Sequence, residues 1–355
     1  MTPPGHKGRG AVSRPPGRYA VRQVEAEPPE PFDEPAPAPE TTLRPLAARG
    51  ILSRNDSPDV PFERSINPYQ GCEHGCIYCY ARPSHSYYDL SPGLDFETQI
   101  FYKPNAVELL LAEWSRPGYE CKPITIGANT DPYQPAERKL GLTRRLLEAF
   151  VEHRHPVCLI SKGSLMRRDL DLLSTLAARN LCSVAISVPT ADNGLKRILE
   201  PRVPAAEARF RLMAELTERG VPTGLLMAPI IPAVNDAEIE RIVAAAAAAG
   251  ARHASYVLLR LPHELKQIFT EWLEAHLPER AAHVMSLVRA ASGGRDYDNR
   301  YGVRQTGRGP YADMIGARFR VACNRHGIRH GRDGLALDTS LFCPPGGRQL
   351  ALTLS

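Results

Sequence analysis

The sequence predicts an α/β fold in which short strands alternate with helix-length segments around a parallel sheet. Short apolar, β-branched runs recur along the chain, and amphipathic stretches long enough for helices separate them. Six strands are predicted, at Ser65–Gln70, Pro123–Gly127, Val157–Ser161, Ser183–Ser187, Thr223–Met227 and Ser255–Leu259. Six β/α units are too few to close an eight-stranded barrel, so we expect a partial TIM-type (β/α)6 barrel.

Helices are predicted between the strands because apolar side chains recur there at helical spacing. The expected helices span Ala106–Trp114, Thr143–His153, Arg168–Arg179, Ala205–Arg219 and Asp236–Ala249. Asn235 followed by Glu238 has the pattern of a capping box at the start of the last helix.

The two ends of the chain differ in composition from this barrel. Residues 1–40 hold ten of the 33 prolines and bury too little apolar surface to fold, so residues 1–48 are predicted to form a disordered tail. The alternative for this tail is a partner-binding arm in which Lys7–Gly10 contacts phosphates. We expect the barrel over residues 49–265 and an arginine-rich C-terminal extension over residues 266–355.

Overall composition excludes several protein classes. Hydrophobic residues make up 43% of the 355 residues, which is enough for a core, and the net charge of +5 is too small for a polycation. No apolar run reaches the length of a membrane span, and the N-terminus lacks the apolar segment of a signal peptide. Eight cysteines are too few for a disulfide scaffold. We therefore expect a cytoplasmic protein, without membrane partners, whose thiols are free for metal binding or chemistry.

The sharpest local feature is a cysteine triplet that directly follows the first predicted strand. Cys72, Cys76 and Cys79 have the spacing C-x3-C-x2-C. Three thiolates this close in sequence converge on one point only if the chain loops around it, and Gly71 and Gly75 permit the necessary turns. The triplet therefore predicts a metal centre.

Two kinds of metal centre compete for these thiolates. A closed zinc site needs a fourth ligand, for which His74 or His85 is available, although neither lies at a familiar finger spacing. An iron–sulfur cluster held by four cysteines needs another nearby thiol, and the next one, Cys121, belongs to a different β/α unit. The favoured interpretation is a [4Fe–4S] cluster with three thiolate ligands and one iron open to a substrate or cofactor.

This motif, with Tyr78 as the aromatic residue of C-x3-C-x-Φ-C, resembles that of the radical SAM superfamily. The resemblance implies that the open iron binds S-adenosylmethionine (SAM). It further implies that one electron from the reduced cluster cleaves SAM to a 5′-deoxyadenosyl radical, which abstracts hydrogen from a substrate. A flavodoxin- or ferredoxin-type protein is then the expected one-electron donor.

Further matches resemble the spore photoproduct lyase branch, often labelled DNA repair photolyase-like, and within it a bacterial family of unassigned substrate. The segments that resemble the branch are Cys79–Tyr80, Asn129–Asp131, Ser161–Lys162, Val184–Ser187, Glu200–Pro201 and Ala228–Pro229. Those that resemble the bacterial family are Ser65–Cys72, Thr130–Pro135 and Leu258–Pro262. One departure stands out: spore photoproduct lyases carry a hydrogen-donor cysteine where this chain has Gly127–Thr130. That difference argues against the same repair reaction, unless another cysteine approaches from elsewhere in the fold. The candidates, each with the ordinary alternative of a small buried apolar residue, are Cys121, Cys158, Cys182, Cys323 and Cys343.

Polar residues follow the predicted strands, at the edge of a β/α barrel where chemistry takes place. Each of them has an ordinary alternative as a turn or helix-cap residue. The residues are Asn129, Thr130, Asp131, Ser161, Lys162, Ser187 and Arg260. Together they are expected to form a ring that faces the cysteine loop.

The resemblance assigns cofactor-binding roles to some of these residues. It implies that Lys162 and Ser187 bind the carboxylate and ribose of SAM, that Thr130 or Asp131 lies nearby, and that Tyr78 packs by the adenine. Glu200 and Arg209 are expected to form either a structural ion pair or part of the cofactor wall.

Tyr80 is the candidate catalytic residue, since a tyrosine just after the cysteine loop can relay a hydrogen atom. The ordinary alternative is a core aromatic residue whose hydroxyl is satisfied by a hydrogen bond.

A basic segment near the C-terminus suggests a polyanionic partner. Arg289–Arg332 holds ten arginines and three aspartates in a glycine-rich stretch with interleaved tyrosines, which is typical of surfaces that bind nucleic acid. The alternative is a loop that closes the barrel, with its arginines paired to Asp296, Asp298 and Asp313.

Three functions follow from the sequence. The first is a radical SAM enzyme acting on an unknown substrate. The second is a lyase or base-modifying radical SAM enzyme that acts on nucleic acid. The third is a non-catalytic iron–sulfur or zinc protein that binds nucleic acid.

Overall fold

A computed structural model describes residues 6–20, 39–331 and 336–346. Its main sheet has the strand order β11-β10-β9-β8-β7-β6-β3-β2, and the strands from β3 to β10 run parallel. These strands are β3 (Arg64–Ile66), β6 (Ile124–Ile126), β7 (Val157–Ser161), β8 (Cys182–Ser187), β9 (Thr223–Ile230) and β10 (His253–Leu258). The six predicted β/α units are confirmed. Because their strands run parallel, the carboxyl ends of all six strands lie on the same side of the sheet.

Short strands lie at both edges of this sheet. At one edge, β2 (Leu52–Arg54) pairs antiparallel with β3, and at the other, β11 (Arg329–His330) pairs parallel with β10. Each has one strand partner among the described residues. The sheet therefore curves as an open, partial barrel.

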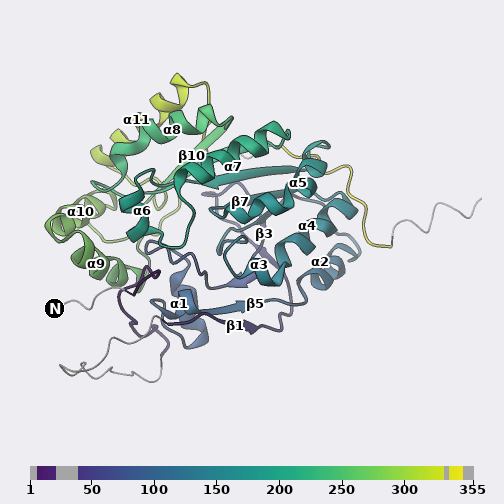
Figure 1. Cartoon of the computed structure of the whole chain (residues 1–355), viewed down its shortest axis with the longest axis horizontal. Helices are drawn as coiled ribbons and strands as arrows, with labels where there is room; N and C mark the ends of the chain where they lie inside the picture. The colour runs from purple at the N-terminus through teal and green to yellow at the C-terminus, as the bar shows by residue number, and fades with distance from the viewer. Residues whose placement is uncertain (1–5, 21–38, 332–335, 347–355) are drawn as a thin grey trace, which may run out of the picture.

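The five predicted helices are present and cover the outer face of the sheet (Figure 1). They are α2 (Ala106–Trp114), α4 (Leu142–His153), α5 (Leu170–Ala177), α7 (Ala206–Glu218) and α8 (Ile239–Ala248). Their apolar faces and the sheet form one core; for example, Leu146 and Phe150 of α4 belong to the same buried cluster as Ile126 and Leu159. Burial of this apolar surface stabilises the barrel.

Smaller elements surround the barrel (Figure 1). A second sheet has the order β1-β5-β4 and contains β1 (Thr42–Pro45), β4 (Tyr69–Gln70) and β5 (Gln99–Tyr102), so the first predicted strand is divided between two sheets. Short helical turns are η1 (Arg82–Tyr88), α1 (Asp95–Thr98), α3 (Glu137–Leu140), η2 (Ser164–Asp169), α6 (Asn193–Leu199) and η3 (Asp236–Glu238). The C-terminal part adds α9 (Leu265–His276), α10 (Pro278–Ala291) and α11 (Pro310–Arg325). None of the helices described is long and apolar enough to cross a membrane.

The predicted N-terminal tail is only partly described, because residues 1–5 and 21–38 lie outside the described ranges. The described part packs against the rest of the chain: Ala11 is fully buried, and β1 pairs with β5. Arg9 donates hydrogen bonds to the carbonyl oxygens of Glu97 and Pro39, at 2.9 and 2.6 Å, so within this structure its guanidinium is engaged by the protein itself.

The capping box expected at Asn235 and Glu238 is wrong. Asn235 is fully buried, and its side chain accepts from Ile231 N at 2.6 Å and donates to the carbonyl oxygens of Pro189 and Pro229. Its amide thus joins the loops after β8 and β9, a role that local sequence does not reveal.

We expect Asn235→Ala to lower the free energy of unfolding by more than about 2 kcal/mol, because it leaves a buried N–H and two carbonyls without their partner. Asp192→Ala is the matched control: Asp192 is a true helix cap that accepts from Leu195 N at 2.8 Å, so its loss is expected to cost about 1 kcal/mol. Urea unfolding measures both. Equal effects would mean that the buried contacts of Asn235 contribute no more to stability than a helix cap does.

Candidate active site

The cysteines lie on the loop formed by residues 71–80, here called the cluster loop, between β4 and η1. Gly71 and Gly75 have φ values of 82° and 68°, in the left-handed region that glycine adopts without strain. The turns expected from the sequence are therefore present, and they fold the cysteine triplet into a compact loop.

Backbone contacts from several elements hold the cluster loop in place. Cys72 N donates to Phe96 O at 2.9 Å, and Ile77 N donates to Leu199 O at 3.1 Å. The Gln134 side chain binds one N–H and one carbonyl of the loop, at 3.0 and 3.1 Å. The loop is thus fixed by β/α units far away in sequence.

All three thiols of the loop are free, with Cys72 and Cys76 buried and Cys79 half-buried. Burial raises the pKa of Cys72 well above its ordinary value, and the nearby Asp131 and the other two cysteines raise it further. Burial likewise raises the pKa of Cys76 to about 12. Thiolates at these positions therefore need a cationic partner, which metal ligation supplies.

This donor set fits an iron–sulfur cluster better than a zinc ion. In the described ranges, no three His, Cys, Asp or Glu side chains converge as the ligands of a single metal ion. The two histidines considered as zinc ligands have protein neighbours: His74 lies 3.3 Å from Asp131, and His85 Nε2 lies 2.9 Å from the Gln99 carbonyl. Three cysteines on one short loop match the three-thiolate cluster.

Asp131 joins the ends of β6 and β7. Its carboxylate accepts hydrogen bonds from Ser161 Oγ at 2.7 Å, Lys162 N at 2.8 Å and Tyr133 N at 2.9 Å. Burial alone would raise the pKa of Asp131, but the His74 ring and these donors hold it well below its ordinary value. Asp131 thus shapes the site by orienting its neighbours.

Thr130 also has a positioning contact. It is buried, and its hydroxyl donates to Tyr69 O at 2.7 Å. The buried Asn67 side chain accepts from Asn129 N and Thr130 N at 2.9 and 3.4 Å. Asn67 was not among the predicted site residues, although it lies within the segment Ser65–Cys72 that carries the resemblance.

Lys162 brings a cation to the cluster loop. Its Nζ lies 5.9 Å from the centre of the Tyr78 ring, and among the described side chains no carboxylate forms an ion pair with it. Burial would lower the pKa of Lys162, but negative charge on Cys76 and Glu200 raises it. The lysine is therefore a charged group available to an anionic ligand beside the thiols.

Glu200 and Arg209 form a fully buried ion pair at 2.8 Å. The Tyr78 hydroxyl donates to Glu200, and Arg209 donates to the Ser187 carbonyl at 2.8 Å. The Ser187 hydroxyl is 3.4 Å from Ala228 O. Of the two roles considered for the pair, the contacts favour the structural one, which fixes Tyr78 and the end of β8.

Tyr80 lies at the surface of the site. Its side chain is 44% exposed, its hydroxyl donates to Ala128 O, and the Arg260 guanidinium lies 4.5 Å from its ring centre. Tyr80 is therefore not a core aromatic residue, and that part of the alternative is wrong. The other part is confirmed, because its hydroxyl makes a hydrogen bond. The Tyr80–Arg260 pair joins the cluster loop to the end of β10.

The arginine-rich segment makes ion pairs to two of the three aspartates that its loop-closing interpretation names. Arg289 pairs with Asp296 at 2.8 Å and Arg300 with Asp298 at 2.6 Å.

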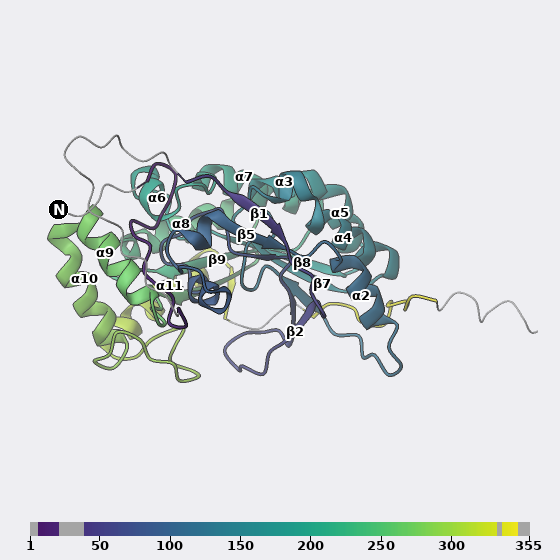
Figure 2. The same cartoon turned by 90° about the horizontal axis from the view of Figure 1, so that it is seen from below.

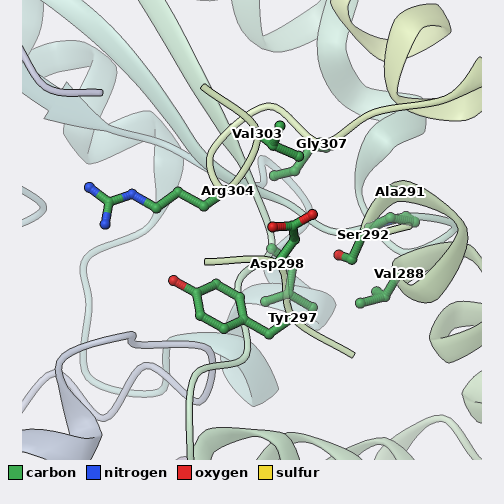
Figure 3. A pocket seen from close by; sticks show the side chains of 11 residues that line it. Val288, Ala291, Ser292, Tyr297, Asp298, Val303, Arg304 and Gly307 are labelled. Carbon is green, nitrogen blue, oxygen red and sulfur yellow. The ribbon is translucent and has the colours of Figure 1, made fainter. Parts of the chain in front are cut away.

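Arg304 reaches the buried carboxylate of Asp59, at 2.6 Å, in the loop after β2. Asp59 also accepts from Gly302 N at 2.7 Å. Figure 3 shows Arg304 extending away from Asp298, which points into a small pocket beside the end of β10. The volume of this pocket is about 10 Å³, room for about one water molecule and too small for a substrate. The loop that carries Arg304 therefore joins the end of β10 to the loop after β2.

Comparison with known proteins identifies the family of this chain. Residues 66–246 match the model of the radical SAM superfamily. An uncharacterized protein of Mycobacterium bovis is 34% identical over 232 residues, covering 65% of this chain and 68% of the relative. A radical SAM Nalpha-GlyT isomerase of Pseudomonas phage M6 is 28% identical over 190 residues, or 52% of this chain and 37% of that protein.

The fold is shared with spore photoproduct lyase. One structure of that enzyme, a mutant, has a TM-score of 0.59 and 14% identity over 88% of both chains. Another, complexed with dinucleoside spore photoproduct, has a TM-score of 0.59 and 13% identity over 81% of both chains. The chain belongs to the radical SAM superfamily, whose members use a [4Fe–4S] cluster and SAM. Within it, the barrel resembles that of spore photoproduct lyase, and relatives such as the mycobacterial protein are uncharacterized.

We expect Cys72→Ala, Cys76→Ala and Cys79→Ala each to lose the bound iron and sulfide, because a cluster with three protein ligands does not survive the loss of one. Cys158→Ala is the control, since Cys158 is a half-buried thiol on β7 outside the loop. Iron and sulfide are measured after anaerobic reconstitution. Full iron retention in any loop variant would contradict the three-ligand assignment.

Proposed function

We propose that this protein is a radical SAM enzyme in which Cys72, Cys76 and Cys79 hold the [4Fe–4S] cluster. The observation that supports this most is three free thiols on one glycine-turned loop at the carboxyl ends of the strands, beside Lys162, whose Nζ has no ion-pair partner among the described residues. When bound, the cluster and SAM supply one-electron cleavage of the SAM C–S bond and hydrogen abstraction from a substrate.

The residues around the loop bind and orient the cofactor in this proposal. Lys162 binds the SAM carboxylate, and the bond from its backbone N–H to Asp131 fixes where its side chain begins. Ser187 and Thr130 shape the wall at neighbouring strand ends, and Tyr78 forms an apolar surface for the adenine. An electron-transfer protein of the flavodoxin or ferredoxin type would supply the electron.

The substrate side of the site is marked by Tyr80 and Arg260. Tyr80 is exposed next to Cys79, where a substrate can reach it, so we retain it as the candidate hydrogen-atom relay. Arg260 stacks on its ring and adds positive charge at the site entrance. An anionic or aromatic substrate fits this pair best.

A second candidate is a radical SAM enzyme that modifies or repairs nucleic acid. An arginine stacked on an exposed aromatic ring is the kind of surface on which bases stack. The solved relative with a bound dinucleoside supports the class by fold alone. The missing cysteine between Gly127 and Thr130 still argues against the same lyase reaction.

The proposed activity predicts that the reconstituted protein, reduced anaerobically with dithionite, converts SAM to 5′-deoxyadenosine and methionine. Cys76→Ala serves as the inactive control and Cys158→Ala as the active one. Chromatography with mass detection measures both products. A protein that carries a full cluster but forms neither product would contradict an enzymatic role and favour a non-catalytic iron–sulfur protein.

Lys162→Ala is expected to weaken SAM binding by roughly 10- to 100-fold, because a charge-assisted contact contributes about 1.5–3 kcal/mol. Cluster content should stay unchanged, since the thiols belong to a separate loop. The EPR signal of the reduced cluster, titrated with SAM, reports the affinity. Lys122→Ala is the control. Lys122 lies just before β6, at the amino ends of the strands and so opposite the site, and it pairs with Glu63. An affinity within twofold of wild type would remove Lys162 from the cofactor site.

If nucleic acid is the substrate, single-stranded DNA or RNA should bind with an affinity that falls steeply with salt. Arg260→Ala should weaken that binding about tenfold, because the stacked cation beside Tyr80 is lost. Arg300→Ala is the control, since Arg300 already pairs with Asp298. Fluorescence anisotropy measures both. No binding at low salt would leave small molecules as the substrate class.

A further inference from the structure

Residues 6–20, here called the N-terminal strap, lie against the cluster loop rather than projecting from the barrel. Figure 2 shows this dark purple segment running beside α9 and the elements that surround the loop. Arg14 pairs with Asp95 of α1 at 2.8 Å, and Arg18 pairs with Glu264, which precedes α9, at 3.1 Å. The strap is therefore attached on both sides of the site.

Glu97 forms the joint between the strap and the loop. Its buried carboxylate accepts from the backbone N–H groups of Gly10 and Ala11, at 3.0 and 2.9 Å. The same carboxylate pairs with Arg82, and both of these charged side chains are fully buried. Arg82 Nε in turn donates to Cys76 O at 2.9 Å. A continuous set of buried contacts thus leads from the strap to a cluster cysteine.

The strap also packs directly on the loop. A Cβ placed on Gly10 would lie 1.8 Å from the Gly75 carbonyl oxygen, so only glycine fits at this contact. Ala11 is fully buried and belongs to the same apolar cluster as Cys76, Ile77 and Tyr78. This packing excludes water from one side of the loop.

We infer that the strap is a positioning part of the cluster site: it holds the cluster loop in its ligating conformation and shields it from water and oxygen. The inference rests on the proposed function, in which these cysteines hold the cluster. Its physical basis is that Glu97 needs the two strap N–H groups. Without them, a buried carboxylate is left with fewer donors, and the Arg82 contact to Cys76 loosens with it.

The test uses full-length Gly10→Ala, which forces the strap off the Gly75 carbonyl. Gly50→Ala is the matched control, because a Cβ there meets nothing within 4 Å. Glu97→Gln is the second variant: it removes one acceptor oxygen from the strap and also the charge that Arg82 pairs with, so Gly10→Ala is the variant that isolates the strap. In each protein we would measure iron and sulfide content, the rate of cluster bleaching in air, and, without metal, the alkylation rate of each cysteine by mass spectrometry.

We expect Gly10→Ala and Glu97→Gln to bleach about tenfold faster than wild type and to alkylate Cys76 and Cys79 faster by a similar factor. Cys182, fully buried on β8, reports opening of the whole barrel and should react as in wild type. Gly50→Ala should match wild type throughout.

Two results would overturn the inference. One is unchanged alkylation of Cys76 and Cys79 in both variants, and the other is a rise in Cys182 alkylation that parallels theirs, which would show that the strap stabilises the whole fold. Failure of the wild-type protein to take up any cluster would instead overturn the proposed function. The alkylation measured without metal would still decide the role of the strap.

Discussion

The need to keep three thiols close together and largely out of water governs the organisation of this protein. Burial raises the pKa values of Cys72 and Cys76, which disfavours their thiolate forms unless a metal ligates them. A short loop with two left-handed glycines cannot hold such a conformation alone. The surrounding elements therefore supply the contacts that fix it.

Two fully buried ion pairs provide much of that support. Arg82–Glu97 binds the Cys76 carbonyl on one side, and Glu200–Arg209 binds the Tyr78 hydroxyl on the other. Burying such pairs costs desolvation energy that apolar residues would avoid. These pairs instead orient the loop, because one member of each pair makes a hydrogen bond to a specific atom of the loop. The N-terminal strap adds donors to the first pair and so belongs to the same framework.

The polar residues at the strand ends divide into two groups by their contacts. Asp131, Thr130 and the Ser161 hydroxyl are used up by hydrogen bonds within the protein, so they position the site. Lys162 Nζ and the Tyr80–Arg260 pair keep charged or aromatic surface available to ligands. In the proposed function, this division puts cofactor binding beside β7 and substrate contact beside β10, with the cluster loop between them.

Sequence alone determined the parts of this protein that depend on local pattern. The six parallel strands, the five helices and the cysteine loop were predictable, because apolar periodicity and glycine-turned cysteine spacing act over a few residues. Tertiary structure decided the rest. Four contacts join residues that local sequence pattern does not pair. They are the buried hydrogen bonds of Asn235, the contact of Asn67 with the loop after β6, the Arg304–Asp59 ion pair and the Gly10–Glu97 hydrogen bond. A hydrogen bond or ion pair between distant segments has no periodicity to read, since it forms only when folding brings its donor and acceptor together.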